Sequence, residues 1–140
     1  MMVNGEVLMT RTESNLKRAI AGEAKARLEY TAFAMKAMEE GFPEYAQLFM
    51  EAAGAETIHG ISHLRVAGEV RSTFENLDES ANGEDFEIEE MYPEFIREAN
   101  EDSRPDAAAS FELAVERERH HREMFKKAFA EMQKSAAKAA

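Results

Sequence analysis

The 140-residue sequence contains no cysteine, only three prolines and seven glycines, and no long apolar run. Without cysteine the chain cannot form disulfides, thiolate metal sites, iron–sulfur centres or a cysteine nucleophile. No apolar stretch approaches the ~18 residues that a membrane helix needs. Residues 1–9 have no basic region followed by an apolar run, so no signal peptide is expected. These absences favour a cytoplasmic protein without a membrane span.

Positive charge is also scarce, with 17 Lys and Arg against 28 Asp and Glu and a net charge of −11. Nucleic acids and anionic membrane surfaces are therefore poor partners, because both select basic proteins. Two interpretations of the acidity stay open. The acids keep the protein soluble, or some of them are ligands for cations.

Helix-forming residues dominate, and no segment alternates as a strand does. We predict one all-α domain, a four-helix bundle, over residues 1–140. Thr10 with Glu13 forms a capping box, Gly41-Phe42-Pro43 ends a helix, and Gly83 and Pro93 predict a kink. The predicted helices cover residues 13–40, 44–67, 72–102 and 105–134, with 1–9 an N-terminal tail and 135–140 a fraying C-terminus.

Each predicted helix has an apolar stripe at three-to-four spacing, such as Tyr45, Leu48 and Phe49 in the second helix. Acidic residues and histidines interrupt every stripe. They are Glu23, then Glu56 and His59, then Glu84 and Glu87, and last Glu118 and His121. Burying an unpaired carboxylate costs several kcal/mol, so several carboxylates in one core need cations. Two metal ions would neutralise most of this charge.

The motif Glu-x-x-His occurs twice, as Glu56-x-x-His59 and Glu118-x-x-His121. Residues three apart share a helix face, so one metal can receive a carboxylate and an imidazole together. Oxygen-rich sites with one imidazole per metal suit iron or manganese. The predicted turns lie near the midpoints between candidate ligands of successive helices, which would bring the carboxylates to one height. Two such motifs plus one Glu from each other helix is the known pattern of di-iron carboxylate bundles.

The chain resembles the ferritin-like di-iron domain of rubrerythrin over roughly residues 10–129. The matches are Arg11-Thr12-Glu13, Ala21-Gly22-Glu23 with Ala26-Arg27 and Tyr30, Glu56-x-x-His59, Gly83-Glu84-x-x-Glu87 with Glu90-Met91-Tyr92-Pro93 and Phe95, and Glu118-x-x-His121.

The resemblance implies that two iron ions, oxo- or hydroxo-bridged, are ligated by Glu23, Glu56, Glu84, Glu118 and His121. Manganese or zinc can occupy the same ligands. It further implies that one iron exchanges Glu87 for His59 on redox change. Tyr30 and Tyr92 match tyrosines that hydrogen-bond the ligand carboxylates, and the implied activity is reduction of hydrogen peroxide to water.

Two departures from the family pattern carry expectations. The family's rubredoxin domain needs four cysteines, so electrons must come from a separate donor protein such as rubredoxin. Only residues 69–72 connect the second and third helices, where the family has a long crossover. Either the bundle runs up-down-up-down, or the chain forms a homodimer in which helices are swapped.

Three other functions remain as alternatives: a ferroxidase or iron-storage protein, a di-metal oxidase, and a non-enzymatic interaction bundle. Beside the candidate ligands, His63 is expected to be a packing or outer-sphere residue, and His120 to point away from the stripe. Gly22 and Gly83 are expected to allow close approach of helices next to the metals.

Overall fold

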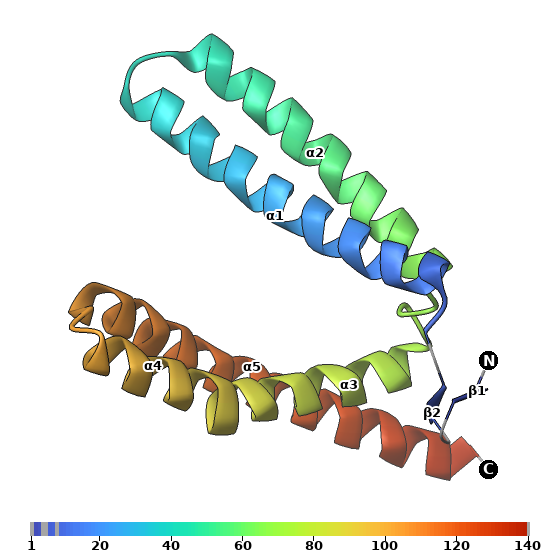
Figure 1. Cartoon of the computed structure of the whole chain (residues 1–140). Coiled ribbons are helices and arrows are strands. Elements are labelled where there is room, and N and C mark those ends of the chain that lie inside the picture. Colours follow the sequence, from blue (N-terminus) through green and yellow to red (C-terminus); the bar gives the residue numbers. More distant parts are fainter. Residues whose placement is uncertain (1, 4–5, 8, 140) are drawn as a thin grey trace. The chain divides into compact units, whose positions relative to one another are not determined.

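The computed structural model describes residues 2–3, 6–7 and 9–139, which form two compact units, Met1–Val70 and Arg71–Ala140. The described residues are almost entirely helical, as the sequence predicts, in four helical segments (Figure 1). The first unit contains β1 (Met2–Val3), β2 (Glu6–Val7), α1 (Arg11–Glu39) and α2 (Pro43–Val66). The second contains α3 (Thr73–Phe86), η1 (Glu87–Met91), α4 (Tyr92–Glu101) and α5 (Pro105–Ala139).

The predicted N-terminal tail contains an unpredicted feature, because β1 and β2 pair as antiparallel strands of two residues each. Residues 1, 4, 5 and 8 of that segment lie outside the described residues. At the other end, α5 continues five residues beyond the predicted end at Lys134. The extension has the sequence Ser-Ala-Ala-Lys-Ala, and alanine is the strongest helix former.

In the first unit α1 and α2 form an antiparallel hairpin and lie side by side along their length (Figure 1). Its contact surface consists of small residues, which allow the helices to pack closely. The buried ones are Ala34, Ala37, Ala46 and Ala53. Phe49 packs against this cluster, and its ring stacks on Tyr30 and meets Phe33 edge-on.

Only part of the predicted α2 stripe contacts α1 within this hairpin. Tyr45 and Leu48 are 56% and 62% exposed, whereas Ala46 and Phe49 face α1. Of the predicted stripe residues, Phe49 contacts α1, whereas Tyr45 and Leu48 lie outside the contact between α1 and α2.

In the second unit α3, η1 and α4 form one continuous helical rod that runs antiparallel to α5 (Figure 1). Ile88 and Val115 are the largest buried apolar residues of this pair. Aromatic rings close both ends. Phe74 stacks on Phe129 at one end, and Tyr92, Phe95 and Phe111 cluster at the other.

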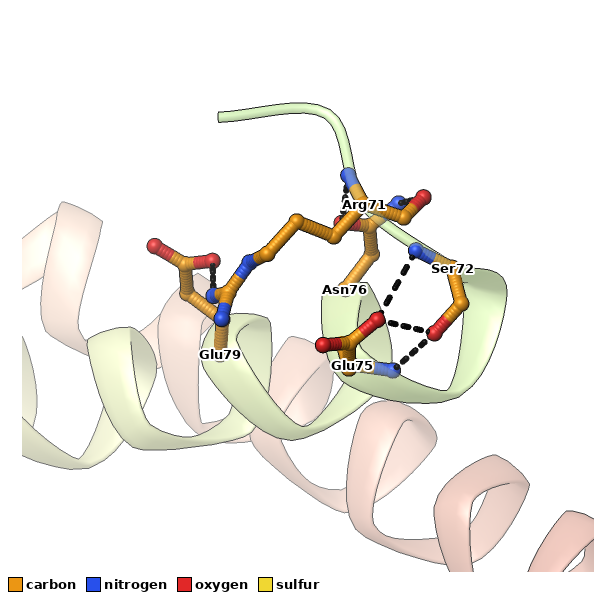
Figure 2. Close-up of polar contacts among 5 residues, drawn as sticks. All are labelled: Arg71, Ser72, Glu75, Asn76 and Glu79. Carbon is orange, nitrogen blue, oxygen red and sulfur yellow. Dashed lines mark hydrogen bonds and ion pairs between the residues drawn. The ribbon is translucent and has the colours of Figure 1, made fainter. Parts of the chain in front are cut away.

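Side-chain caps fix the starts of α1 and α3. Thr10 with Glu13, as predicted, and Ser72 with Glu75 form reciprocal capping boxes. Figure 2 shows the second of these, together with Arg71, which exchanges hydrogen bonds with Asn76 and forms an ion pair with Glu79. The residue before the cap is therefore tied to the first two turns of α3.

The predicted kink in the third helix is a π-helical turn, η1. Pro93 has no N–H and would clash with the carbonyl of Glu89 in a regular α-helix. The turn before it widens, and the N–H of Tyr92 donates to the carbonyl of Glu87, five residues earlier. This widening accommodates Pro93 at the start of α4 without ending the helix.

Among the residues that the structure describes, no helix combines the length and apolar character that would let it cross a membrane.

Candidate metal centre

Each unit brings together two glutamates and one histidine. One potential ligand atom from each residue of a trio lies within 4.8 Å of the other two. The first trio is Glu23, Glu56 and His59, and the second trio is Glu84, Glu118 and His121. In both, one helix supplies Glu-x-x-His and its antiparallel partner supplies the remaining glutamate. The sequence predicts all six as metal ligands, and the fold gathers them three by three.

In the first trio α1 presents Glu23, and α2 presents Glu56 and His59. The Nδ1 atom of His59 lies 3.1 Å from Glu56 Oε2 and 3.9 Å from Glu23 Oε2. The two carboxylate side chains are 23% and 21% exposed, and the imidazole is 56% exposed. The acids therefore lie on the inner side of the hairpin, with the imidazole at its edge.

The second trio repeats this arrangement between α3 and α5. The Nδ1 atom of His121 lies 2.8 Å from Glu118 Oε2 and 3.8 Å from Glu84 Oε1. Glu84 is the least exposed carboxylate of the six ligands, at 15%. In both trios the same imidazole nitrogen, Nδ1, faces both carboxylates.

The paired carboxylates perturb one another's proton affinity. Burial, together with the hydrogen bond and negative charge of Glu118, raises the pKa of Glu84 to about 7. The pKa of Glu118 is lowered by its hydrogen bonds with His121 and Glu84. In the first trio the hydrogen bond with Glu56 raises the pKa of Glu23, and the same bond lowers the pKa of Glu56. Each pair therefore holds one proton more readily than two separate carboxylates would.

The second trio fits a metal ion by a separate observation. The Oε2 atom of Glu84 is buried and accepts no hydrogen bond from any residue that the structure describes. A buried acceptor without a partner is costly, and a cation is the partner that a carboxylate oxygen lacks here. Carboxylate oxygens and one imidazole nitrogen form the donor set that suits iron or manganese. Glu84, Glu118 and His121 would hold one ion, and Glu23, Glu56 and His59 another.

Three further predicted site residues lie outside the trios. Glu87 starts η1, one turn after Glu84, and its charge contributes to the raised pKa of Glu84. Burial and the charges of Glu87, Glu118 and Glu84 raise the pKa of Tyr92, so its hydroxyl stays protonated beside the second trio. The ring of Tyr30 packs against the rings of both Phe33 and Phe49. The predicted hydrogen bonds of both tyrosines to ligand carboxylates remain predictions.

His63, which the sequence predicts as a packing or outer-sphere residue, has its ring facing the first trio. Its Nε2 atom lies 3.8 Å from Glu23 Oε1, and the side chain is 35% exposed. A spacing of four from His59 puts both imidazoles on one face of α2, and this spacing was the available signal. His120 is exposed.

The expectation for the glycines is wrong within the units. A side chain added at Gly22 or Gly83 would meet nothing within 4 Å. The close approach occurs at Gly60, where an added Cβ would lie 3.5 Å from Glu23 Cβ. Gly60 directly follows His59, and at this point α2 lies at ordinary van der Waals distance from the Glu23 turn of α1.

Comparison with known proteins gives a consistent assignment. The family model described as Rubrerythrin matches residues 14–129. Nigerythrin from Nitratidesulfovibrio vulgaris is 38% identical over 92% of this chain and 71% of its own length. Rubrerythrin from Porphyromonas gingivalis is 35% identical over 85% of this chain and 66% of its own length.

A solved structure of nigerythrin in its fully reduced, all-ferrous state is 35% identical, covering 95% of this chain and 73% of that one. Its TM-score of 0.45 is too low to support an argument about helix arrangement. The sequence matches carry the family assignment, and the matched range, residues 14–129, spans all six trio residues. The chain belongs to the rubrerythrin family, and is a ferritin-like di-iron protein.

Proposed function

We propose that this protein reduces hydrogen peroxide to water, with two electrons from a pair of iron ions held by the two trios. The repeated Glu, Glu and His trio is the observation that carries the proposal. Each turnover consumes two electrons and two protons, breaks the O–O bond and releases two molecules of water. The iron pair, when bound, supplies the electrons to the peroxide.

The protein's own residues have distinct parts in this proposal. The four trio glutamates would bind the irons and neutralise part of their positive charge. His59 and His121 would each offer the Nδ1 atom as a ligand at the edge of a trio. Glu87 is one turn from Glu84 and is the further carboxylate available to the second trio. Tyr92 keeps its hydroxyl proton in this environment and can donate a hydrogen bond there.

The electrons that re-reduce the iron come from outside these 140 residues. The sequence has no cysteine, so it offers no rubredoxin-type iron site. We propose that an electron donor outside these residues supplies the electrons, with rubredoxin as the first to test.

We propose that the two trios meet in one di-metal centre and that chains exchange helices to form it. A ferritin-like bundle needs one long crossover along its length. The 24 residues of α2 span about 36 Å, but the connector, residues 67–72, reaches at most about 20 Å. Each unit alone also leaves large apolar residues exposed, such as Ile58 at 69% and Leu113 at 59%. Packing against the units of a second chain would cover them.

The test is stopped-flow oxidation of the iron-loaded, reduced protein under anaerobic conditions. We expect hydrogen peroxide to oxidise the iron faster than dioxygen does at equal concentration. The variant Glu118→Gln should lose both its bound iron and the reaction with peroxide. The control variant Glu112→Gln, which changes an exposed acid on the same helix, should keep both. Faster oxidation by dioxygen would contradict the peroxidase and support a ferroxidase or oxidase.

A further inference from the structure

A group of ion pairs joins the two sides of the second unit directly beside the second trio. The Nη1 atom of Arg122 lies 3.5 Å from Asp85 Oδ1 and 3.0 Å from Glu89 Oε1. The Nζ atom of Lys126 lies 2.7 Å from Asp85 Oδ2. Asp85 directly follows the ligand Glu84, and Arg122 directly follows the ligand His121. The Asp85–Arg122 contact thus lies one residue away from a proposed ligand on both helices.

The first unit has no such group at the matching positions. When Glu23 is matched to Glu84, and Glu56-x-x-His59 to Glu118-x-x-His121, the four charged residues fall on apolar ones. Asp85, Glu89, Arg122 and Lys126 correspond to Ala24, Leu28, Gly60 and Leu64. There the helices meet by direct packing, with Gly60 against Glu23. The two trios are alike in their ligands and different in what supports them.

Arg122 contacts one acid just before the helical irregularity and a second acid inside it. Asp85 lies in the last turn of α3, and Glu89 lies inside η1. Between them is Glu87, the first residue of the widened turn. A π-helical turn is a rare departure from the α-helix that is frequent at functional sites, and here Arg122 of α5 contacts it directly. Arg122 is only 22% exposed, and its planar guanidinium can hold two acids at once.

We propose that Arg122 is a positioning residue for the second metal. Its ion pairs hold α3 and η1 against α5, so that Glu84 and Glu87 face Glu118 and His121. This role rests on the proposed di-metal function. On this proposal the geometry of the second trio depends on ion pairs beside it. The first trio is set by helix packing and is independent of Arg122.

Anaerobic titration of the full-length, metal-free protein with Co²⁺ tests this role, because Co²⁺ absorption reports the number and geometry of ligands. The wild type should bind two Co²⁺ ions per chain. Arg122→Gln should weaken one of them by about 10–100-fold and change its absorption band, as loss of a supporting contact does. Arg122→Lys should restore part of the affinity. Glu89→Gln keeps the Asp85 contacts and should cause a smaller loss in the same direction.

The matched control is Arg97→Gln, which removes an exposed ion pair with Glu101 on α4. Both Co²⁺ ions should then bind as in the wild type. Thermal unfolding of each metal-free variant is measured in parallel, because this separates an effect on the metal site from a general loss of stability. Two normal Co²⁺ sites in Arg122→Gln, with only a lower Tm, would overturn the positioning role while the di-metal function stands. A wild type that binds no Co²⁺ would overturn both.

Discussion

Each of the two helical hairpins carries two glutamates and one histidine of the trios. Among these residues, Glu84 is the one whose ionised carboxylate is buried at the greatest energetic cost. Its carboxylate is 15% exposed, one oxygen accepts no hydrogen bond from the described residues, and its pKa is raised to about 7. An ionised Glu84 is therefore unfavourable in the metal-free protein. A bound metal ion makes ionisation of Glu84 favourable instead, because the metal binds the ionised carboxylate.

The metal-free protein should lose stability between about pH 4.5 and pH 7. The pKa of Glu84 rises from its ordinary 4.5 to about 7 on folding, so the folded state binds this proton more tightly. The stabilisation is complete below pH 4.5 and is lost as the pH rises through 7. The lowered pKa values of Glu56 and Glu118 act in the opposite direction, but at pH values below 4.5. Urea unfolding at several pH values measures this, and a flat or rising profile would contradict it.

Glu84→Gln should stabilise the metal-free protein at pH 8 by about 1–3 kcal/mol and have little effect at pH 4. The amide removes the charge whose burial is costly at high pH. The same variant should bind metal more weakly, since it loses a ligand. Glu112→Gln, an exposed acid on α5, is the control and should change neither quantity. Equal stability of Glu84→Gln and the wild type at pH 8 would mean that burying the ionised Glu84 carboxylate does not destabilise the metal-free protein.

At the scale of helices, three C-terminal caps use the same hydrogen-bond pattern with different residues. Gly41 after α1, Gly68 after α2 and Ser103 after α4 all have positive φ, at 83°, 74° and 57°. In each, two successive N–H groups donate back to carbonyls of the last turn, which is the Schellman arrangement. Serine lacks the conformational freedom that glycine has in this region.

Ser103→Gly should therefore raise the free energy of unfolding by about 0.5–1 kcal/mol, because it relieves the left-handed conformation of a residue with a Cβ. Gly68→Ser, the matched reverse change, should lower it by a similar amount. Thermal unfolding of both variants in the metal-free state checks the pair. A destabilised Ser103→Gly variant would indicate that the serine side chain makes a contact worth more than the strain.

Local rules predicted helix ends well and helix contacts less well. Thr10 with Glu13, Gly41 and Pro105 marked boundaries because caps and turns depend on residues close in sequence. Gly83 and Pro93 predicted a kink, but its form as a π-helical turn depends on how the backbone rearranges around the proline.

Contacts between helices depend on which rotation the packing selects, and periodicity defines rotation only to within about one residue. That is why periodicity does not show that Ala46 contacts α1 while Tyr45 and Leu48 do not, nor that Gly60 rather than Gly22 lies against the neighbouring helix. The candidate ligands were easier to find. Carboxylates inside an apolar stripe are unusual, and spacing alone places Glu56 and His59, or Glu118 and His121, on one face.

At the scale of the whole molecule, the short connector at residues 67–72 leads us to expect a dimer. Light scattering of the iron-loaded protein should give twice the mass of one chain. Inserting a long flexible linker after Gly68 should let one chain form the centre alone and shift the population toward monomer. A wild-type monomer that still binds two irons would contradict helix exchange between chains.

The most direct test of the central claim is the metal content of the full chain after anaerobic loading with ferrous iron and removal of the excess. We expect two irons per chain, a large loss of bound iron in Glu118→Gln, and an unchanged iron content in Glu112→Gln. Iron far below this stoichiometry in the wild type, or equal retention in both variants, would contradict a di-iron centre built from these two trios.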